Sequence, residues 1–239
     1  AAGILDEARR AAKPAQIAPP DAAPTSAPLT EPQLEILTAA QLSDEASCAF
    51  NESISTALDG TVDIDALKKA LDAVVARHQA LRGRVGRADE RMHFSPSLLL
   101  APELLDYSRD ADPEARLSGV LAVDARKAFD LWTGPLVRAT LIRLAHDRLV
   151  VLFTAHHIVC DGWSVNIILK DLAELYRQSC SGQHVTLPDA PSFSQYALGQ
   201  AASKDVLKAD LRYWVSQFDD LPPLPDLPTD RSRPAQRSY

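Results

Sequence analysis

The stretch from Leu149 to Ser179 constrains the fold most strongly, because two different periodicities meet in it. Residues 149–155, LVVLFTA, are almost continuously apolar, as expected of a strand that is covered on both faces. After Gly162 the apolar residues recur at i, i+3, i+4 and i+7, which predicts an amphipathic helix that runs to about Ser179. The chain must therefore place a central strand of a sheet beside a helix, with a turn between them.

Helical and strand patterns are mixed over the rest of the central region. Helices are predicted over residues 64–78, 112–127 and 205–218, with Pro113 in the first turn of the second. Strands are predicted over 46–58, 135–145 and 148–157, and a hairpin over 81–95 has its turn near residues 88–90. With no internal repeat, this order predicts an α+β fold in which a mixed β-sheet is flanked by long α-helices.

Proline marks both ends of the chain. Six of the seventeen prolines lie between Pro14 and Pro32, and five lie between Pro222 and Pro234. We expect residues 1–27 to be an Ala/Pro-rich linker, 28–221 to be the folded unit, and 222–239 to be a Pro-rich segment leading out of it. The chain starts without methionine, which suggests a piece of a longer protein.

Composition limits the class of protein. A net charge of −7 and a pI near 5.3 provide no basic stripe for nucleic acid. Cys48, Cys160 and Cys180 are odd in number and far apart, so neither a disulfide framework nor a zinc knuckle is indicated, and a reducing cytoplasm is the expected location. No apolar run approaches the roughly 20 residues of a membrane span, so no membrane partner is expected.

The segment TAHHIVCDGWS, residues 154–164, concentrates the groups that could do chemistry. Neighbouring residues on a strand point to opposite faces, so His156 and His157 cannot enter the same cavity. His157 shares a face with Phe153, and His156 shares one with Thr154. One ring can therefore reach a pocket at the strand end while the other hydrogen-bonds into the fold, although a packed core residue is the simpler reading of either histidine alone.

Asp161 and Gly162 lie where the strand gives way to the helix. Asp161 can cap the first free N–H groups of the helix, and it can also hold an arginine or the histidine in a fixed orientation. Gly162 leaves room for a ligand to approach the backbone. A zinc site lacks a third ligand, Ser164 is not in a GxSxG turn, and Cys160 is expected to be a buried, inert thiol.

The pattern HHxxxDG, residues 156–162, resembles the core motif of condensation domains of nonribosomal peptide synthetases, within the acyltransferases related to chloramphenicol acetyltransferase. Four further stretches resemble that family's motifs in the family's order: residues 29–42, 77–82, 129–144 and 227–234. Residues 43–53, SDEASCAFNES, resemble the subtype found in mixed polyketide–peptide assembly lines. Residues 163 and 164 resemble condensation rather than epimerisation domains.

The resemblance implies a chloramphenicol acetyltransferase-like lobe that forms amide bonds. Its partners would be an upstream acyl or peptidyl carrier protein, a downstream peptidyl carrier protein and a C-terminal lobe, and its substrates would be carried on 4′-phosphopantetheine, with no cofactor bound by the domain itself. His157 would contact the attacking amine, His156 would be mainly structural, and Asp161 would pair with an arginine of RHQALR, Arg82 ahead of Arg77. Gly162 would let the thioester come close.

The sequence departs from the family pattern at some places. Ile36 and Leu37 stand where methionine or tryptophan is usual, and Trp132 occupies a position that tends to be small or polar. The family's second lobe is absent from the 239 residues, so we expect the isolated lobe to be inactive by itself. The alternatives are a lobe that binds carrier protein without catalysis, or an acyltransferase of the same fold that forms esters or acts on a free amine.

Overall fold

The computed structural model describes residues 23–182, 187–218, 220, 223 and 228–232. Its strands are β1 (Ser26–Pro28), β2 (Asn51–Asp59), β3 (Gly83–Val85), β4 (Arg91–Phe94), β5 (Glu103–Asp106), β6 (Val137–Ala145) and β7 (Arg148–His156). Its helices are α2 (Glu31–Ala40), α3 (Asp44–Cys48), α4 (Ile64–Arg77), the 3-10 turn η2 (Gln79–Arg82), α5 (Pro113–Ala125), α6 (Gly162–Ser181), α7 (Phe193–Ala202) and α8 (Lys204–Ser216).

A four-stranded sheet with the order β2-β7-β6-β5 forms the centre of the fold. Strand β7 is antiparallel to both β2 and β6, whereas β5 runs parallel to β6, so the sheet is mixed as predicted. A smaller three-stranded sheet has the order β1-β4-β3, and its β3–β4 pair is the predicted hairpin.

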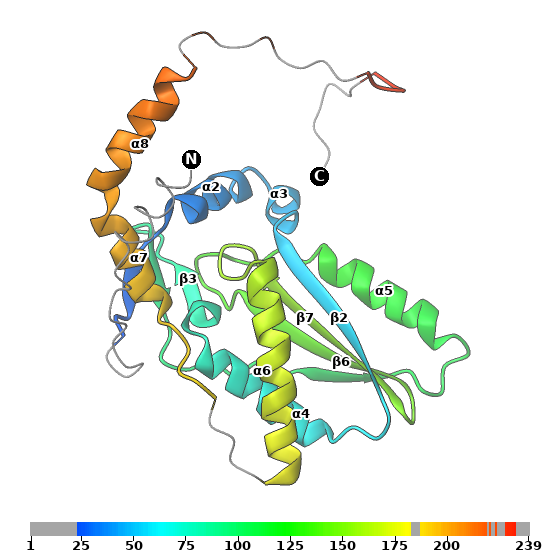
Figure 1. The fold of residues 1–239 in the computed structure, drawn as a ribbon. Helices are drawn as coiled ribbons and strands as arrows, with labels where there is room; N and C mark the ends of the chain where they lie inside the picture. Colours follow the sequence, from blue (N-terminus) through cyan, green and yellow to red (C-terminus); the bar gives the residue numbers. More distant parts are fainter. Residues whose placement is uncertain (1–22, 183–186, 219, 221–222, 224–227, 233–239) are drawn as a thin grey trace, which may run out of the picture.

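The central strand β7 is covered on both faces, which explains its continuous apolar run. Val150 and Leu152 belong to a cluster that packs against α5, whereas Val151 and Phe153 belong to the larger core that includes residues of α4 and α6. Helices α4 and α6 lie on one face of the sheet and α5 lies on the other (Figure 1). The prediction drawn from residues 149–155 is confirmed.

Aspartates begin the three long helices that flank the sheet. The side chains of Asp63, Asp112 and Asp161 each accept a hydrogen bond from the backbone N–H three residues further on. Each bond satisfies one of the N–H groups that a helix start leaves unpaired. At the other end of α6, Gly182 adopts φ +67°, a left-handed conformation that glycine adopts without steric cost.

Two predictions about elements need correction. The strand expected over residues 46–58 starts only at Asn51, because Ser43 accepts a hydrogen bond from the N–H of Ala46 and so begins the short helix α3. Strand β1 falls across the end of the predicted 1–27 linker, where Ala27 is fully buried. Helix α7 was not predicted. Residues 1–22 and most of 222–239 lie outside the described residues.

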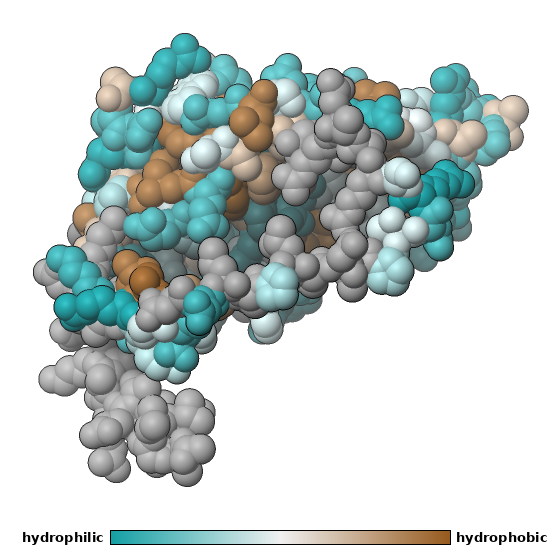
Figure 2. Space-filling view, turned by 90° about the horizontal axis from the view of Figure 1, so that it is seen from above, coloured by the Kyte–Doolittle hydropathy of each residue, from teal (hydrophilic) through white to brown (hydrophobic). Residues whose placement is uncertain are grey.

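Helices α7 and α8 extend along one side of the molecule (Figure 1). Several large apolar side chains of these helices and the residues after them are at least 40% exposed: Tyr196, Leu198, Leu211, Tyr213, Trp214, Val215 and Phe218. Seen from above, hydrophobic residues interrupt the hydrophilic surface of the molecule (Figure 2). Within the described ranges, no helix combines the length and the apolar character needed to cross a membrane.

Candidate active site

The turn between β7 and α6 brings together the four residues that the sequence singles out. Strand β7 ends at His156, and the N–H of His157 donates to the carbonyl of Phe50 at 2.8 Å, which fixes the chain as it leaves the sheet. The ring of His156 is fully buried, whereas the side chain of His157 is 34% exposed. The prediction that the two rings occupy different environments is confirmed.

His156 is packed inside the lobe. Its Nδ1 accepts a hydrogen bond from the N–H of Ile158 at 3.2 Å, so the ring proton resides on Nε2, which lies 3.5 Å from Oγ of Ser47. The ring of Phe129 meets the imidazole edge-on at 6.2 Å. Burial, with a smaller contribution from the charge of His157, lowers the pKa of His156 to about 4, so the ring is neutral at pH 7.

His157 presents one ring nitrogen to two acceptors. Its Nδ1 lies 3.1 Å from the carbonyl oxygen of Cys160 and 3.0 Å from Oε1 of Glu52. Neither oxygen can donate a proton when Glu52 is ionised, so Nδ1 carries the hydrogen and Nε2 of the neutral ring is the acceptor nitrogen. The arrangement therefore sets a single tautomer, with a lone pair on the nitrogen that points away from Glu52.

Asp161 acts as the N-cap of α6. Its Oδ1 accepts from the N–H of Ser164 at 2.8 Å and from the Ser164 hydroxyl at 2.5 Å. These bonds, first of all that of the hydroxyl, lower the pKa of Asp161, and the charge of His157 lowers it further. Gly162 is exposed, and a Cβ built on it would meet nothing within 4 Å, so the backbone beside the turn is open to a ligand.

The predicted pairing of Asp161 with an arginine is wrong. Arg82 lies in η2 and donates to the backbone carbonyl of Ser95, beyond β4, while Arg77 donates from Nε to Asp171 at 2.8 Å. Helix α4 thus directs Arg77 toward α6, and the turn after α4 directs Arg82 toward the small sheet. Both arginines connect elements of the fold, and in the described part of the chain neither forms an ion pair with Asp161.

The thiol of Cys160 and the hydroxyl of Ser164 are not available as nucleophiles. Cys160 is buried, and burial, followed by the negative charges of Asp161 and Glu52, raises the pKa of its thiol to about 12. A thiol with this pKa stays protonated at pH 7 and is a poor nucleophile. Ser164 donates its hydroxyl to Asp161 within the first turn of α6. The structure thus gives both residues the structural positions that the sequence suggests.

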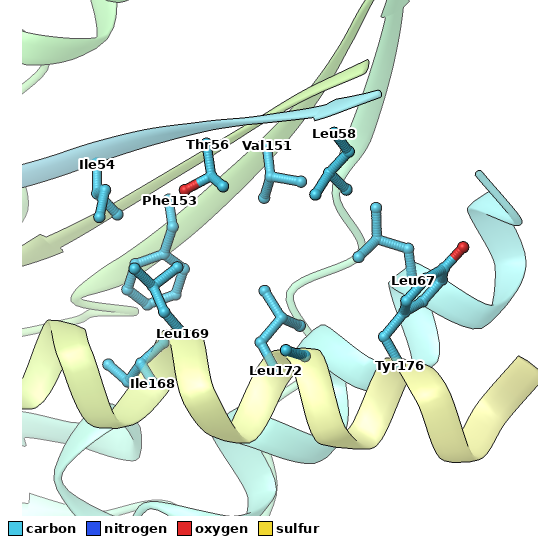
Figure 3. Close-up of a pocket in the computed structure, with 11 residues that line it drawn as sticks. Ile54, Thr56, Leu58, Leu67, Val151, Phe153, Ile168, Leu169, Leu172 and Tyr176 are labelled. Atoms are coloured by element: carbon cyan, nitrogen blue, oxygen red, sulfur yellow. The ribbon is translucent and has the colours of Figure 1, made fainter. Parts of the chain in front are cut away.

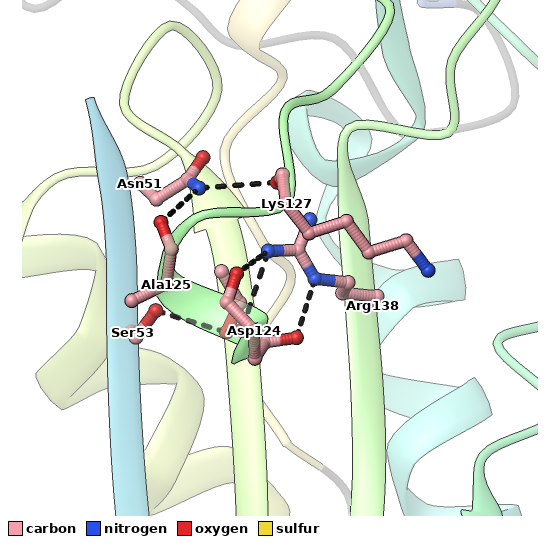
Figure 4. A network of polar contacts seen from close by, with 7 residues as sticks. Asn51, Ser53, Asp124, Ala125, Lys127 and Arg138 are labelled. Carbon is pink, nitrogen blue, oxygen red and sulfur yellow. Dashed lines mark hydrogen bonds and ion pairs between the residues drawn. The ribbon is translucent and has the colours of Figure 1, made fainter. Parts of the chain in front are cut away.

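A buried ion pair on the face of the sheet that α5 covers was not predicted from the sequence. Asp124, at the end of α5, accepts from Nε of Arg138 at 2.6 Å and from the hydroxyl of Thr154 at 2.6 Å (Figure 4). The guanidinium of Arg138 also lies 4.1 Å from the ring centroid of Phe129. The pair therefore links α5 and β6 to β7, and its contact on β7, Thr154, lies two residues before His156.

Asn51 extends this connection to β2. Its Nδ2 donates to the carbonyl oxygens of Ala125 at 2.9 Å and Lys127 at 3.2 Å (Figure 4). Asn51 thereby satisfies backbone groups where α5 ends. Neither Glu52 nor this network was predicted, because the sequence shows polar residues at the start of β2 but does not give the register that places Asn51 opposite His156.

An apolar cavity of about 250 Å³ lies between the sheet and α6 (Figure 3). It is lined by Ile54, Thr56, Leu58, Leu67, Val151, Phe153, Ile168, Leu169, Leu172, Ala173 and Tyr176. Glu52 lies two residues before Ile54, the first residue of β2 that lines the cavity. Because side chains alternate along a strand, Glu52 points to the same face of the sheet as these lining residues, so the cavity and the Glu52–His157 pair share that face.

The mixed sheet, the helices that cover it and the HHxxxDG turn together indicate a condensation-domain fold. The chain belongs to the condensation-domain family, because the model of that family, described as "Condensation domain", matches residues 24–239. The family recognised from the five sequence motifs is therefore confirmed.

Several relatives are similar to this chain. Malpinin synthetase of Mortierella alpina is 37% identical over 217 residues, which cover 89% of this chain and 3% of that protein. Phosphinothricin tripeptide synthetase PhsC of Streptomyces viridochromogenes is 36% identical over 196 residues, covering 78% of this chain and 18% of that protein. The chain thus spans only a small part of the curated relatives that it matches.

Solved structures show the same fold. The starter condensation domain of rhizomide synthetase RzmA superposes with a TM-score of 0.77 at 24% sequence identity. The match covers 84% of this chain and 49% of that chain. The predicted chloramphenicol acetyltransferase-like lobe is confirmed at the level of the fold, and the chain corresponds to about half of the solved domain.

Proposed function

We propose that this chain supplies one wall of the active site of a condensation enzyme. In the proposed reaction, the amine of an aminoacyl thioester on a downstream carrier protein attacks an acyl or peptidyl thioester on an upstream carrier protein. The observation that supports this most directly is His157, whose Nδ1 is engaged by two acceptors so that Nε2 is the nitrogen available to an amine. His156 is proposed to be structural, because it is buried and neutral.

The chemistry needs an uncharged amine and a site for a developing oxyanion. An α-amine has a pKa near 7.7–8.0, so a large part of it is protonated at neutral pH. When the amine attacks, the carbon–nitrogen bond forms and the nitrogen loses one proton, which Nε2 of His157 can accept. The carbon–sulfur bond breaks, and the sulfur stays on the upstream carrier's 4′-phosphopantetheine arm as a thiolate, which becomes a thiol when it takes up this proton. General-base help is typically worth about 10²–10⁴ in rate, and orientation of the amine by the same nitrogen can contribute more.

We propose the open backbone at Gly162 as the place where the thioester approaches. Asp161, as the cap of α6, holds the start of the helix against the turn that carries His157. Arg82 and Arg77 support the fold around this turn from a distance. The substrates would arrive on 4′-phosphopantetheine arms of the two carrier proteins.

A second lobe is proposed to close the other side of the site. The exposed apolar side chains of α8, among them Leu211 and Trp214, offer a face for such a lobe. The stretch 43–53 further suggests a mixed polyketide–peptide assembly line, in which the upstream partner would be an acyl carrier protein. In this proposal the isolated chain binds its carrier but does not turn over.

The test uses a two-lobe condensation domain that contains this chain, together with carriers loaded with acyl and aminoacyl groups. Mass spectrometry of the carriers should show the acyl group transferred to the downstream amine as an amide. Parallel reactions with a free amine and with an alcohol separate the alternative acyltransferases, since preferred transfer to either would contradict the proposal. Carrier binding without transfer by the two-lobe domain would instead identify a docking module.

A further inference from the structure

Glu52 is the acidic residue that touches the proposed catalytic histidine. Its Oε1 lies 3.0 Å from Nδ1 of His157, and its side chain is 39% exposed. We propose that Glu52 is a positioning residue, which fixes the Nδ1–H tautomer of His157 and stabilises the positive charge that the ring acquires when Nε2 accepts a proton. This inference rests on the proposed function, because it assigns Glu52 a role in that same site.

The residues directly before and after Glu52 anchor strand β2. Asn51 donates to the carbonyl oxygens of Ala125 and Lys127, and Oγ of Ser53 lies within hydrogen-bond distance, 3.0 Å, of the hydroxyl oxygen of Thr154 (Figure 4). Since side chains alternate along a strand, these bonds hold the face turned toward α5 and leave Glu52 on the opposite face. The carboxylate is therefore presented to His157 from a fixed backbone.

The carbonyl of Cys160 alone cannot replace Glu52. That carbonyl is neutral, whereas a hydrogen bond to an ionised carboxylate is roughly twice as strong. A negative charge beside Nδ1 stabilises the imidazolium form, as carboxylates do in other catalytic pairs with histidine. Glu52 therefore contributes electrostatic stabilisation that the backbone does not provide.

The other titratable groups near His157 leave this role to Glu52. The carboxylate of Asp161 already accepts two hydrogen bonds from Ser164 in the first turn of α6. The buried ring of His156 is neutral at pH 7, and so is the thiol of Cys160. Among these neighbours, Glu52 supplies the anion in direct contact with the Nδ1 proton of His157.

A first test measures the ring itself and needs no turnover. In ¹⁵N-labelled 239-residue protein, with the His157 signals assigned from a His157→Gln variant, we expect the neutral ring to be protonated at Nδ1. In Glu52→Gln the Nδ1 signal should move and its proton should exchange faster with water. The matched control is Asp59→Asn, which removes one negative charge at the far end of the same strand and should leave the signal unchanged. An Nδ1 signal that ignores Glu52→Gln would overturn the inference.

A second test measures catalysis in the two-lobe domain. Because the pair is partly exposed to solvent, we expect Glu52→Gln to lower kcat by no more than about tenfold, with KM unchanged. Glu52→Asp keeps the charge and should recover part of the loss, and Asp59→Asn should behave like the parent. An unchanged kcat in Glu52→Gln, or a loss confined to KM, would contradict a role in charge stabilisation.

The two tests separate this inference from the proposed function. If the parent domain forms no amide while the Nδ1 signal responds to Glu52→Gln, the proposed function fails and the tautomer-fixing contact stands. If the parent condenses its substrates and Glu52→Gln does so at the same rate, the proposed function stands and the positioning role of Glu52 is refuted.

Discussion

Replacing Asp124 by alanine should destabilise the lobe more than any surface substitution. Asp124 accepts bonds from Arg138 and from Thr154, and the side chains of the Asp124–Arg138 pair are only 10% and 17% exposed. Removing one partner of a buried pair leaves the other charge uncompensated, at a cost of about 3–5 kcal/mol. Because water still reaches part of Arg138, we expect a loss of about 3 kcal/mol in the free energy of unfolding.

Urea unfolding followed by circular dichroism measures this loss. The control is Asp106→Asn, which removes a carboxylate from the Arg143 pair, where the side chains are 46% and 33% exposed, so we expect a much smaller change in the free energy of unfolding. The double variant Asp124→Leu/Arg138→Met should recover much of the stability, because apolar residues of similar size often replace a buried pair without loss. A loss in Asp124→Ala no larger than in Asp106→Asn would refute the reasoning.

Three further predictions concern buried or strained positions. Burial lowers the pKa of His156 from 6.5 to about 4, so between these pH values the unfolded state binds more protons than the folded state. The free energy of unfolding should therefore fall by up to about 3 kcal/mol as the pH is lowered from 6.5 to 4. Urea titrations should show a smaller fall in His156→Gln. Iodoacetamide at pH 7 should modify exposed Cys180 well before buried Cys160, as peptide mass spectrometry would report; the reverse order would contradict the burial. Gly182 has φ +67°, so Gly182→Ala should lower the free energy of unfolding, measured by thermal unfolding, by about 1 kcal/mol. Gly119→Ala inside α5 should instead raise the stability of the protein. Equal changes in stability in the two variants would contradict the left-handed cap.

Local signals predicted the elements that position the histidines. The apolar run of β7, the period of α6 and the Asp161–Gly162 boundary are all properties of neighbouring residues, so they can be read from the chain. Helix α5 was predicted for the same reason, with Pro113 in its first turn, and the structure adds that Asp112 is its cap. The family motifs added the fold of the whole lobe.

Partners that are distant in sequence could not be predicted. Glu52 and His157 meet because β2 pairs with β7 in one particular register, and a shift by one residue would turn Glu52 to the other face. The assignment of Arg82 to Asp161 failed because η2 turns the arginine toward the backbone beyond β4. Strand β1 was missed because three residues pair along a single edge with β4 and carry little periodicity.

The central claim is that His157, and not His156, faces the reacting amine. The most direct measurement is the single-turnover rate of amide formation by His157→Ala in a two-lobe condensation domain containing this chain, with unfolding in urea measured in parallel. We expect a fall of about 10²–10⁴ in rate with the stability of the parent, because the half-exposed ring of His157 contributes little to the core. Condensation at the parent rate by the folded variant would contradict the account.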